Sequence, residues 1–140
     1  MEVMLDNAVI PIVNENDTVS ITELMFTDND ELSGLISQMM GAKTLVLLSN
    51  VDGIYTGNPA EPDSQLIAKV NPKDQLDKYI QAEKSSAGRG GMESKYKTAR
   101  QVSQSGIRVI IANGRRDNIL PQVLTAPHTT PHTEFVPQQR

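Results

Sequence analysis

The chain has 140 residues, a net charge of −4, and neither cysteine nor tryptophan. These values describe one soluble domain or a large piece of one, and the lack of cysteine excludes disulfide frameworks and thiolate metal sites. No apolar run reaches the roughly 18 residues that a membrane-spanning helix needs, and the N-terminus lacks a basic segment before an apolar one. We therefore expect a cytoplasmic protein with no membrane partner.

Charge is divided unevenly along the chain. Residues 1–63 hold 11 acidic side chains and one basic one, whereas residues 64–140 hold 6 acidic and 12 basic ones. This division fits two differently solvated faces, or an acidic half that attracts an amine or cation and a basic half that meets phosphate. Because the basic residues are dispersed and aromatic residues are few, we expect no nucleic-acid partner.

A strand, a helix and a second strand are predicted in the first third of the chain. Residues 8–13 form an apolar, β-branched run that predicts a buried strand. Apolar residues then recur at helical spacing, namely Leu32, Leu35, Ile36, Met39 and Met40. We expect Asp28 or Asp30 to cap this helix and Gly41 to end it. Residues 44–48 predict a fully buried strand.

The rest of the chain alternates in the same way. The predicted elements are a loop with a hairpin at 49–65, a strand at 66–70, a helix at 73–82, a glycine loop at 85–92, a helix running to Gln104 and ended by Gly106, a strand at 107–112, a helix at 117–124 and a strand at 133–136. This alternation predicts an α/β fold, a three-layer αβα sandwich with a mostly parallel sheet. Ligands of such sheets bind at the carboxyl ends of the strands.

The glycine-rich segment 88–95 is the strongest signal for phosphate binding. Glycines leave backbone N–H groups uncovered, and these groups surround an anion readily at the N-terminus of a helix. Lys95 lies one turn into that helix, within reach of the same anion. The spacing matches neither the P-loop nor the dinucleotide fingerprint. A surface turn without a ligand explains these glycines equally well.

Three further polar segments lie near predicted strand or helix ends. Asn14–Asp17 and Asp28–Asp30 offer amides that recognise a carboxylate and carboxylates that attract an amine, a metal or a lysine. Helix capping alone explains an aspartate in the second cluster, but the two clusters together favour a ligand site. Ser49–Asp52 follows a strand and suits the base and ribose of a nucleotide, although turn formation also accounts for these residues.

Four motifs occur together in the chain. They are Pro11–Asp17, Phe26–Ser33, Leu47–Thr56 with Asn58 and Pro59, and Gly88–Met92 with Lys95. In this order and spacing they resemble the glutamate 5-kinase branch of the amino-acid kinase family, from about Leu5 to Gln138. Acetylglutamate kinase, aspartokinase and uridylate kinase share the fold and a late lysine. The paired Asn-Glu-Asn-Asp and Asp-Asn-Asp signatures resemble the glutamate branch.

The resemblance implies ATP-dependent phosphorylation of the side-chain carboxylate of L-glutamate to glutamyl 5-phosphate, with Mg²⁺, as the first step of proline biosynthesis. Such chemistry depends on positioning and on cations where charge develops. By motif, glutamate would bind Asp17 and Asn29, in a pocket shaped by Asn14, Asn16 and Asp28. Asp30 would orient the catalytic lysines. ATP would contact Ser49, Asn50, Arg89, Gly90, Gly91, Met92, Glu93, Ser94 and Lys95, with Lys95 neutralising the transferred group.

The resemblance also concerns the extent of the chain. The family's kinase domain is longer, and its first half carries a glycine loop, a second lysine and a serine that contacts glutamate. We therefore expect residues 1–140 to be the C-terminal, ATP-binding half of an amino-acid kinase domain, without the PUA domain of many members and inactive alone. The intact enzyme would be a homo-oligomer. The alternatives are another amino-acid kinase, such as uridylate or acetylglutamate kinase, and a noncatalytic nucleotide-binding fragment.

Overall fold

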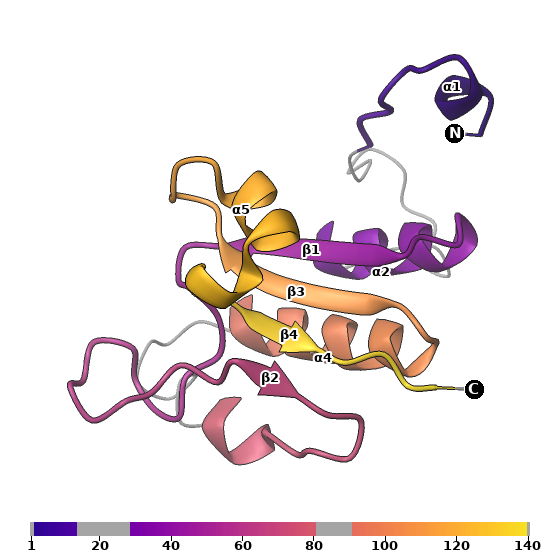
Figure 1. Ribbon diagram of the computed structural model, residues 1–140. Helices are drawn as coiled ribbons and strands as arrows, with labels where there is room; N and C mark the ends of the chain where they lie inside the picture. Colours follow the sequence, from indigo (N-terminus) through magenta and orange to yellow (C-terminus); the bar gives the residue numbers. More distant parts are fainter. Residues whose placement is uncertain (1, 14–28, 81–90, 140) are drawn as a thin grey trace, which may run out of the picture.

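The structure, a computed structural model, describes residues 2–13, 29–80 and 91–139 (Figure 1). Its helices are α1 (Glu2–Asp6), α2 (Asn29–Met39), α4 (Gly91–Gln104) and α5 (Ile119–Thr125), with a 3₁₀ turn, η2, at Pro127–Thr129. Its strands are β1 (Thr44–Ser49), β2 (Lys69–Val70), β3 (Arg108–Asn113) and β4 (Thr133–Phe135). None of the helices in these ranges is both long and apolar enough to cross a membrane.

The four strands form one sheet in the order β1-β3-β4-β2. β1 runs parallel to β3 in a register that pairs Thr44 with Arg108 and Ser49 with Asn113. β2 runs parallel to β4, whereas β3 and β4 are antiparallel. Since two of these three pairings are parallel, the predicted α/β class with a mostly parallel sheet is confirmed.

Helices cover both faces of the sheet, and β3 provides the centre of both cores. Val109 and Ile111 belong to a large cluster with residues of α4, whereas Ile110 and Ala112 pack with Ile119 and Val123 of α5. An apolar run such as 109–112 fits a strand buried on both faces. Figure 1 shows α4 behind the sheet and α5 in front of it. The predicted three layers are therefore present.

The predicted strand at 8–13 is wrong. These residues belong to no strand, and the Ile12 side chain is 95% exposed. A strand needs a neighbouring strand to satisfy its backbone N–H and C=O groups. No strand in the described part of the chain pairs with this run, and Pro11 lacks the N–H group that a ladder would use.

The strand predicted at 44–48 is confirmed as β1, but its full burial is wrong. Leu47 is buried, whereas Leu48 is 45% exposed. β1 ends the strand order and pairs only with β3 among the described strands. Hydrophobicity alone therefore overestimated burial, because the position of a strand within the sheet decides how much of it is covered.

Helix α2 forms where predicted, and Gly41 adopts a left-handed φ of 63° just beyond its end. Its best-covered residues, however, are Gly34 and Ser37 rather than the long apolar ones, and Met39 is 72% exposed. A methyl group on Gly34 would lie 2.8 Å from Thr98 Cγ2 of α4. The small residue therefore lets α2 and α4 pack closely side by side.

The remaining predictions are largely confirmed. α4 ends at Gln104, and Gly106 has a φ of 98°; α5 and β4 also form where expected. An antiparallel bridge between Tyr55 and Leu66 supplies the hairpin of the predicted loop. The returning strand is only Lys69–Val70, and the next helix begins at residue 77 rather than 73, because the Asp74 carboxylate closes a turn by accepting a hydrogen bond from Asn71 N–H.

Candidate active site

Several predicted site residues lie at one edge of the sheet. α2 and α4 each connect through a short segment to the strand that follows, β1 and β3, and pack against it. Each helix therefore runs opposite to its strand, and its N-terminus lies near the carboxyl end of that strand (Figure 1). Such an edge is the usual ligand-binding position in open α/β sheets.

Lys95 and Asp30 form an ion pair that joins α4, one turn after its start, to the first turn of α2. Lys95 Nζ donates a hydrogen bond of 3.0 Å to Asp30 Oδ2. Both side chains are mostly buried, at 17% and 19% exposed. An ammonium group has three protons, and within the described residues this contact uses only one. Within the described residues, the pair therefore holds the lysine in place and leaves two of its protons for another acceptor.

The first turn of α4 is open to a ligand at its start. Gly91 is exposed, and apart from its chain neighbours and the backbone of α4, no heavy atom of the described residues lies within 4 Å of the position that a Cβ would take there. The Met92 side chain is buried in the core, so a contact from this residue to a ligand would come from its backbone. Glu93 lies 3.5 Å from Lys97 in an ion pair, and Ser94 is half-buried.

Ser49 and Asn50 stand where β1 ends. Ser49 is half-buried, pairs with Asn113 in the sheet register, and accepts a 2.8 Å hydrogen bond from Gly114 N–H at its carbonyl. Asn50 is exposed. Both residues are therefore accessible at the edge that also carries Lys95 and Asp30.

The predicted glutamate-binding residues are only partly within the described chain. Asn29 is the exposed first residue of α2, directly before Asp30. The other predicted residues lie outside the described residues, namely Asn14, Asn16, Asp17, Asp28, Arg89 and Gly90. The expected capping by Asp28 falls there too, whereas Asp30 is the second residue of α2 rather than its cap.

A second ion pair, which sequence reasoning did not single out, joins the loops after β1 and β3. The Asp52 carboxylate accepts hydrogen bonds from Arg116 Nε at 2.7 Å and from Arg116 Nη2 at 2.8 Å. It also accepts weaker ones from Asn113 Nδ2 at 3.3 Å and Tyr55 Oη at 3.4 Å. We call these four residues the Asp52 cluster.

The Asp52 cluster changes the acid–base behaviour of its titratable members. The hydrogen bonds from Arg116 lower the pKa of Asp52, against the opposing effect of burial. Burial, followed by the negative charge of Asp52, raises the pKa of Tyr55. Asp52 is therefore a carboxylate at neutral pH, with its acceptor sites already used by protein donors.

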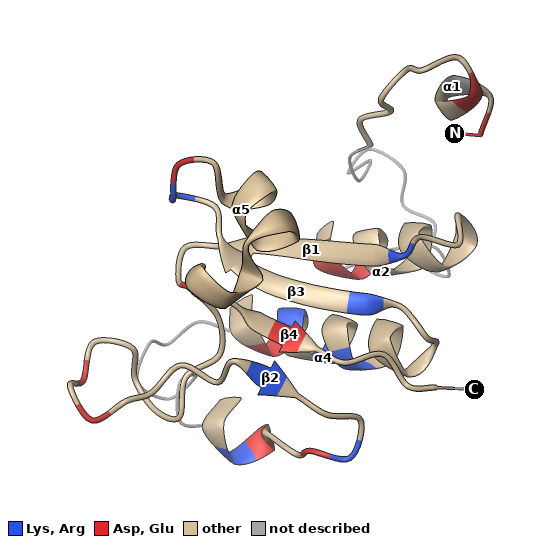
Figure 2. Cartoon of the chain, viewed as in Figure 1, with Lys and Arg blue, Asp and Glu red and all other residues tan. Residues whose placement is uncertain are grey.

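The uneven charge distribution and, for Lys95 with Asp30, the family resemblance were the signals for these pairings. Each of the two ion pairs joins an acidic residue of segment 1–63 to a basic residue of segment 64–140. In Figure 2 the acidic positions of α2 contrast with the basic positions of α4. The partners are 65 residues apart in the first pair and 64 in the second, so no local motif links them.

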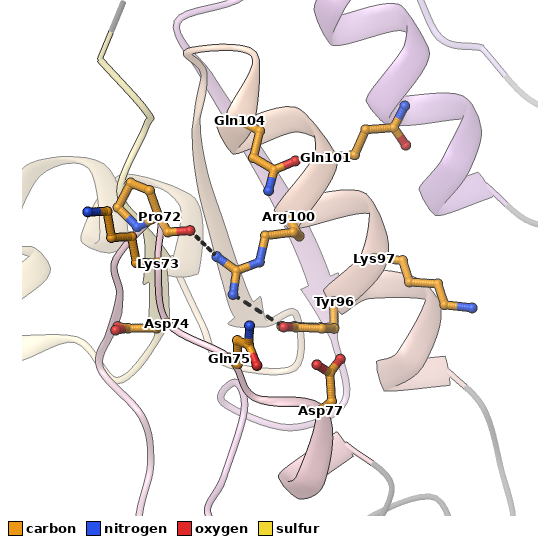
Figure 3. Close-up of a pocket in the computed structure, with 10 residues that line it drawn as sticks. All are labelled: Pro72, Lys73, Asp74, Gln75, Asp77, Tyr96, Lys97, Arg100, Gln101 and Gln104. Atoms are coloured by element: carbon orange, nitrogen blue, oxygen red, sulfur yellow. Dashed lines mark hydrogen bonds between the residues drawn. The ribbon is translucent and has the colours of Figure 1, made fainter.

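A cavity of about 620 Å³ lies elsewhere, between α4 and the segment before residue 78 (Figure 3). Arg100 lies in it with its Cζ 5.6 Å from the centre of the Tyr96 ring. Its guanidinium donates to Pro72 O at 3.1 Å and to Tyr96 Oη at 3.3 Å. The lining residues include none of the predicted site residues, and the Arg100 contacts tie residues 71–72 to α4.

Metal binding has no ready-made protein site in the described ranges. Among residues 2–13, 29–80 and 91–139, no three His, Cys, Asp or Glu side chains are grouped to hold an ion. Asp30 and Asp52, the two carboxylates identified at this edge, each accept hydrogen bonds from a basic side chain.

Comparison with known proteins gives relatives over nearly the whole chain. The chain is 60% identical over 137 residues to glutamate 5-kinase of Bacteroides thetaiotaomicron, covering 98% of this chain and 38% of that protein. It is 46% identical over 127 residues to glutamate 5-kinase of Chlorobaculum tepidum, covering 87% of this chain and 34% of that protein. The chain thus spans little more than a third of the length of these relatives.

The fold also occurs in solved structures. Carbamate kinase from Giardia lamblia, bound to AMP-PNP, matches with a TM-score of 0.55 and 20% identity, covering 79% of this chain and 36% of that one. Residues 1–113 match the amino acid kinase family. From this match, together with the sheet and the helices on both its faces, we conclude that the chain belongs to the amino acid kinase family.

Proposed function

We propose that the chain is the ATP-binding part of a glutamate 5-kinase, which transfers the γ-phosphoryl group of ATP to the side-chain carboxylate of L-glutamate. The observation that carries this proposal is the 60% identity over 137 residues to a glutamate 5-kinase. Because the chain spans 38% of that relative, the proposal assigns the activity to the whole enzyme and the nucleotide site to this part.

Membership of a kinase family implies the use of ATP, and the edge of the sheet offers suitable groups. Phosphoryl transfer spreads negative charge over the transferred group, which a positioned cation stabilises. Lys95, held by Asp30, would be that cation, and the N–H groups at the start of α4 would add their partial positive charge. Ser49 and Asn50 would meet the nucleotide at the end of β1.

Mg²⁺ would enter this site with ATP. In such sites the ion is held through the substrate phosphates and one or two carboxylates rather than by a full protein cage. Asp30 and Asp52 are the described carboxylates at this edge, and no group of three His, Cys, Asp or Glu side chains forms a cage in the described ranges, so the ion would be held mainly through the phosphates of ATP. When bound, Mg²⁺ would neutralise phosphate charge, while Lys95 and the start of α4 orient the transferred group.

Glutamate would bind beside the start of α2. Amide groups donate to a carboxylate, and aspartates accept from an ammonium group, so both ends of an amino acid have suitable partners in such a set. The proposed residues are Asp17 and Asn29 as direct contacts, with Asn14, Asn16 and Asp28 shaping the pocket. A homo-oligomeric assembly and a cytoplasmic location, both expected from the sequence, stay predictions.

A chimera tests the proposal directly. The 137 matched residues would replace the corresponding segment of the Bacteroides thetaiotaomicron glutamate 5-kinase. ADP formation would be measured with glutamate, and with UMP or N-acetylglutamate in its place. The proposal expects ADP formation that depends on glutamate, and no turnover with the other two acceptors.

Two outcomes would contradict the proposal. Turnover with UMP or N-acetylglutamate, but not with glutamate, would assign the chain to another branch of the family. A folded chimera that uses none of the three acceptors would favour a noncatalytic nucleotide-binding role. Circular dichroism of the same sample would establish that the chimera is folded.

A further inference from the structure

The loop that follows β1 is fixed to the rest of the molecule at three points. At its start, the Ser49 carbonyl accepts a hydrogen bond from Gly114 N–H. In the middle, the Asp52 carboxylate is held by the side chains of the Asp52 cluster. At its end, Ile54 N–H donates a hydrogen bond of 2.9 Å to Thr133 Oγ1. Two of these three contacts reach the segment after β3.

The middle contact is the strongest by geometry. Arg116 meets Asp52 with two parallel, charge-assisted hydrogen bonds, an arrangement that fixes orientation as well as distance. The Asp52 side chain is 15% exposed, whereas that of Arg116 is 44% exposed and contributes nothing to the core clusters. The role of Arg116 is therefore to be sought in the loop that it holds rather than in packing.

We propose that Arg116 is a positioning residue for the nucleotide: acting through Asp52, it holds the loop after β1 so that Ser49 and Asn50 meet ATP. This inference rests on the proposed function. It also assigns Asp52 a supporting role, because its two oxygens already accept four protein hydrogen bonds. A direct contact from this carboxylate to ribose or metal would require breaking them.

The test is a double-mutant cycle on the 140-residue chain. Four proteins are compared: the unaltered chain, Arg116→Met, Asp52→Asn and the double variant. Arg115→Met is the matched control, because it removes the same charge from the adjacent position. Arg115 donates a hydrogen bond to Asn113 Oδ1 through its backbone N–H, which the substitution keeps. Binding of Mg²⁺ with AMP-PNP is measured by calorimetry, and amide hydrogen exchange is followed in residues 50–55.

The inference predicts coupled effects. Arg116→Met should weaken AMP-PNP binding about tenfold, the scale of losing one charge-assisted contact, and should speed amide exchange in residues 50–55. In the Asp52→Asn variant, the further change Arg116→Met should alter the affinity for AMP-PNP by less than about twofold. The two side chains act as one unit, so the losses of affinity from the two substitutions do not add. The control should match the unaltered chain in both measurements.

Four results would overturn the inference. Equal and additive losses from the two single variants would mean that Arg116 touches the nucleotide itself. Faster exchange without loss of affinity would mean that the cluster only stiffens the loop, and unchanged exchange would mean that it does not hold the loop at all. If the unaltered, folded chain fails to bind AMP-PNP, the nucleotide site of the proposed function fails first, and this inference falls with it.

Discussion

Two ion pairs lie at the same edge of the sheet and differ in how fully their charges are satisfied. In the described residues, Lys95 and Asp30 share one hydrogen bond, which joins α4 to α2 near the starts of the two helices. Asp52 accepts four, two of them from one guanidinium, across two loops. Both pairs join the acidic and the basic segments of the chain, and among the described residues the Asp52 carboxylate is the more fully engaged acceptor.

This difference distinguishes a side chain that can bind substrate from side chains that hold a loop in place. A lysine with one partner and two further protons can bind a phosphate without first losing a network of contacts. The Arg116 guanidinium keeps further N–H groups beside its bidentate contact, but that contact fixes the direction in which they point. We therefore propose Lys95 as the group that meets substrate and the Asp52 cluster as its support.

Removing the Lys95 ammonium should have the largest effect on the chemistry. In the active chimera, Lys95→Met should lower kcat by about 100-fold to 1,000-fold, as for loss of one group that stabilises transition-state charge. Lys97→Met is the control, because Lys97 is 74% exposed and contacts only Glu93 among the described residues. Steady-state kinetics of both variants measure the effect. Equal kcat values for the two would contradict the role of Lys95.

Gly53 should be the most sensitive position in the loop after β1. A methyl group there would overlap Thr133 Oγ1 and come within 3.0 Å of its backbone nitrogen, so Gly53→Ala should lower the free energy of unfolding by about 1–3 kcal/mol. Gly57→Ala is the control, since its methyl would lie 3.6 Å from Ser64 Oγ. Urea unfolding measures the free energy of unfolding of both variants. Equal values would show that the loop can shift to accommodate the added methyl group.

Asp30→Asn should have a moderate effect on catalysis. The amide oxygen still accepts a hydrogen bond from Lys95, but the charge that attracts the ammonium group is gone. We expect kcat of the chimera to fall about tenfold, corresponding to about 1.4 kcal/mol, with KM for ATP changed less. The measurement is steady-state kinetics beside the Lys95→Met variant. A loss as large as that variant's would mean that Asp30 acts on substrate directly.

Asp52 should contribute the smallest effect, and one that depends on pH. Because its pKa is lowered in the folded chain from an ordinary value of 3.8, its ion pair stabilises the fold above that pH. The contribution is lost as pH falls from there through the lower, folded-state pKa. Asp52→Asn should therefore cost about 1 kcal/mol near neutral pH and progressively less below about pH 3.8.

Urea unfolding of the unaltered chain and of Asp52→Asn at about pH 7 and about pH 3 measures this difference. The two unfolding free energies should be closer at the lower pH. A difference that stays the same, or grows, on acidification would show that the Asp52 charge is not what stabilises the loop.

The fold could be predicted from the sequence wherever local sequence patterns determine the helix or strand. α4 and its end follow from the glycines before and after it, and β3 follows from an uninterrupted apolar run. The run at 8–13 has the same apolar character as β3 but forms no strand. Pattern alone cannot tell them apart, because strand formation depends on a neighbour that lies far away in sequence.

The candidate site also has one part that could be predicted from the sequence and one part that could not. The role of Lys95 beside Asp30 was expected from the family resemblance, and the two side chains are in contact. Asp52 fell within a segment selected for its position after β1, but nothing in that segment indicates Arg116 as its partner. Such a pairing depends on the register of β1 and β3, which brings the two loops together only in the folded chain.

The most direct test of the account is a titration of the 140-residue chain with Mg²⁺ and AMP-PNP, carried out on the unaltered chain and on Lys95→Met. Circular dichroism of both samples establishes that they are equally folded. The account predicts that the unaltered chain binds the nucleotide and that Lys95→Met binds it at least about tenfold more weakly. Equal affinities, or no binding by the folded, unaltered chain, would contradict a phosphate-binding site at Lys95.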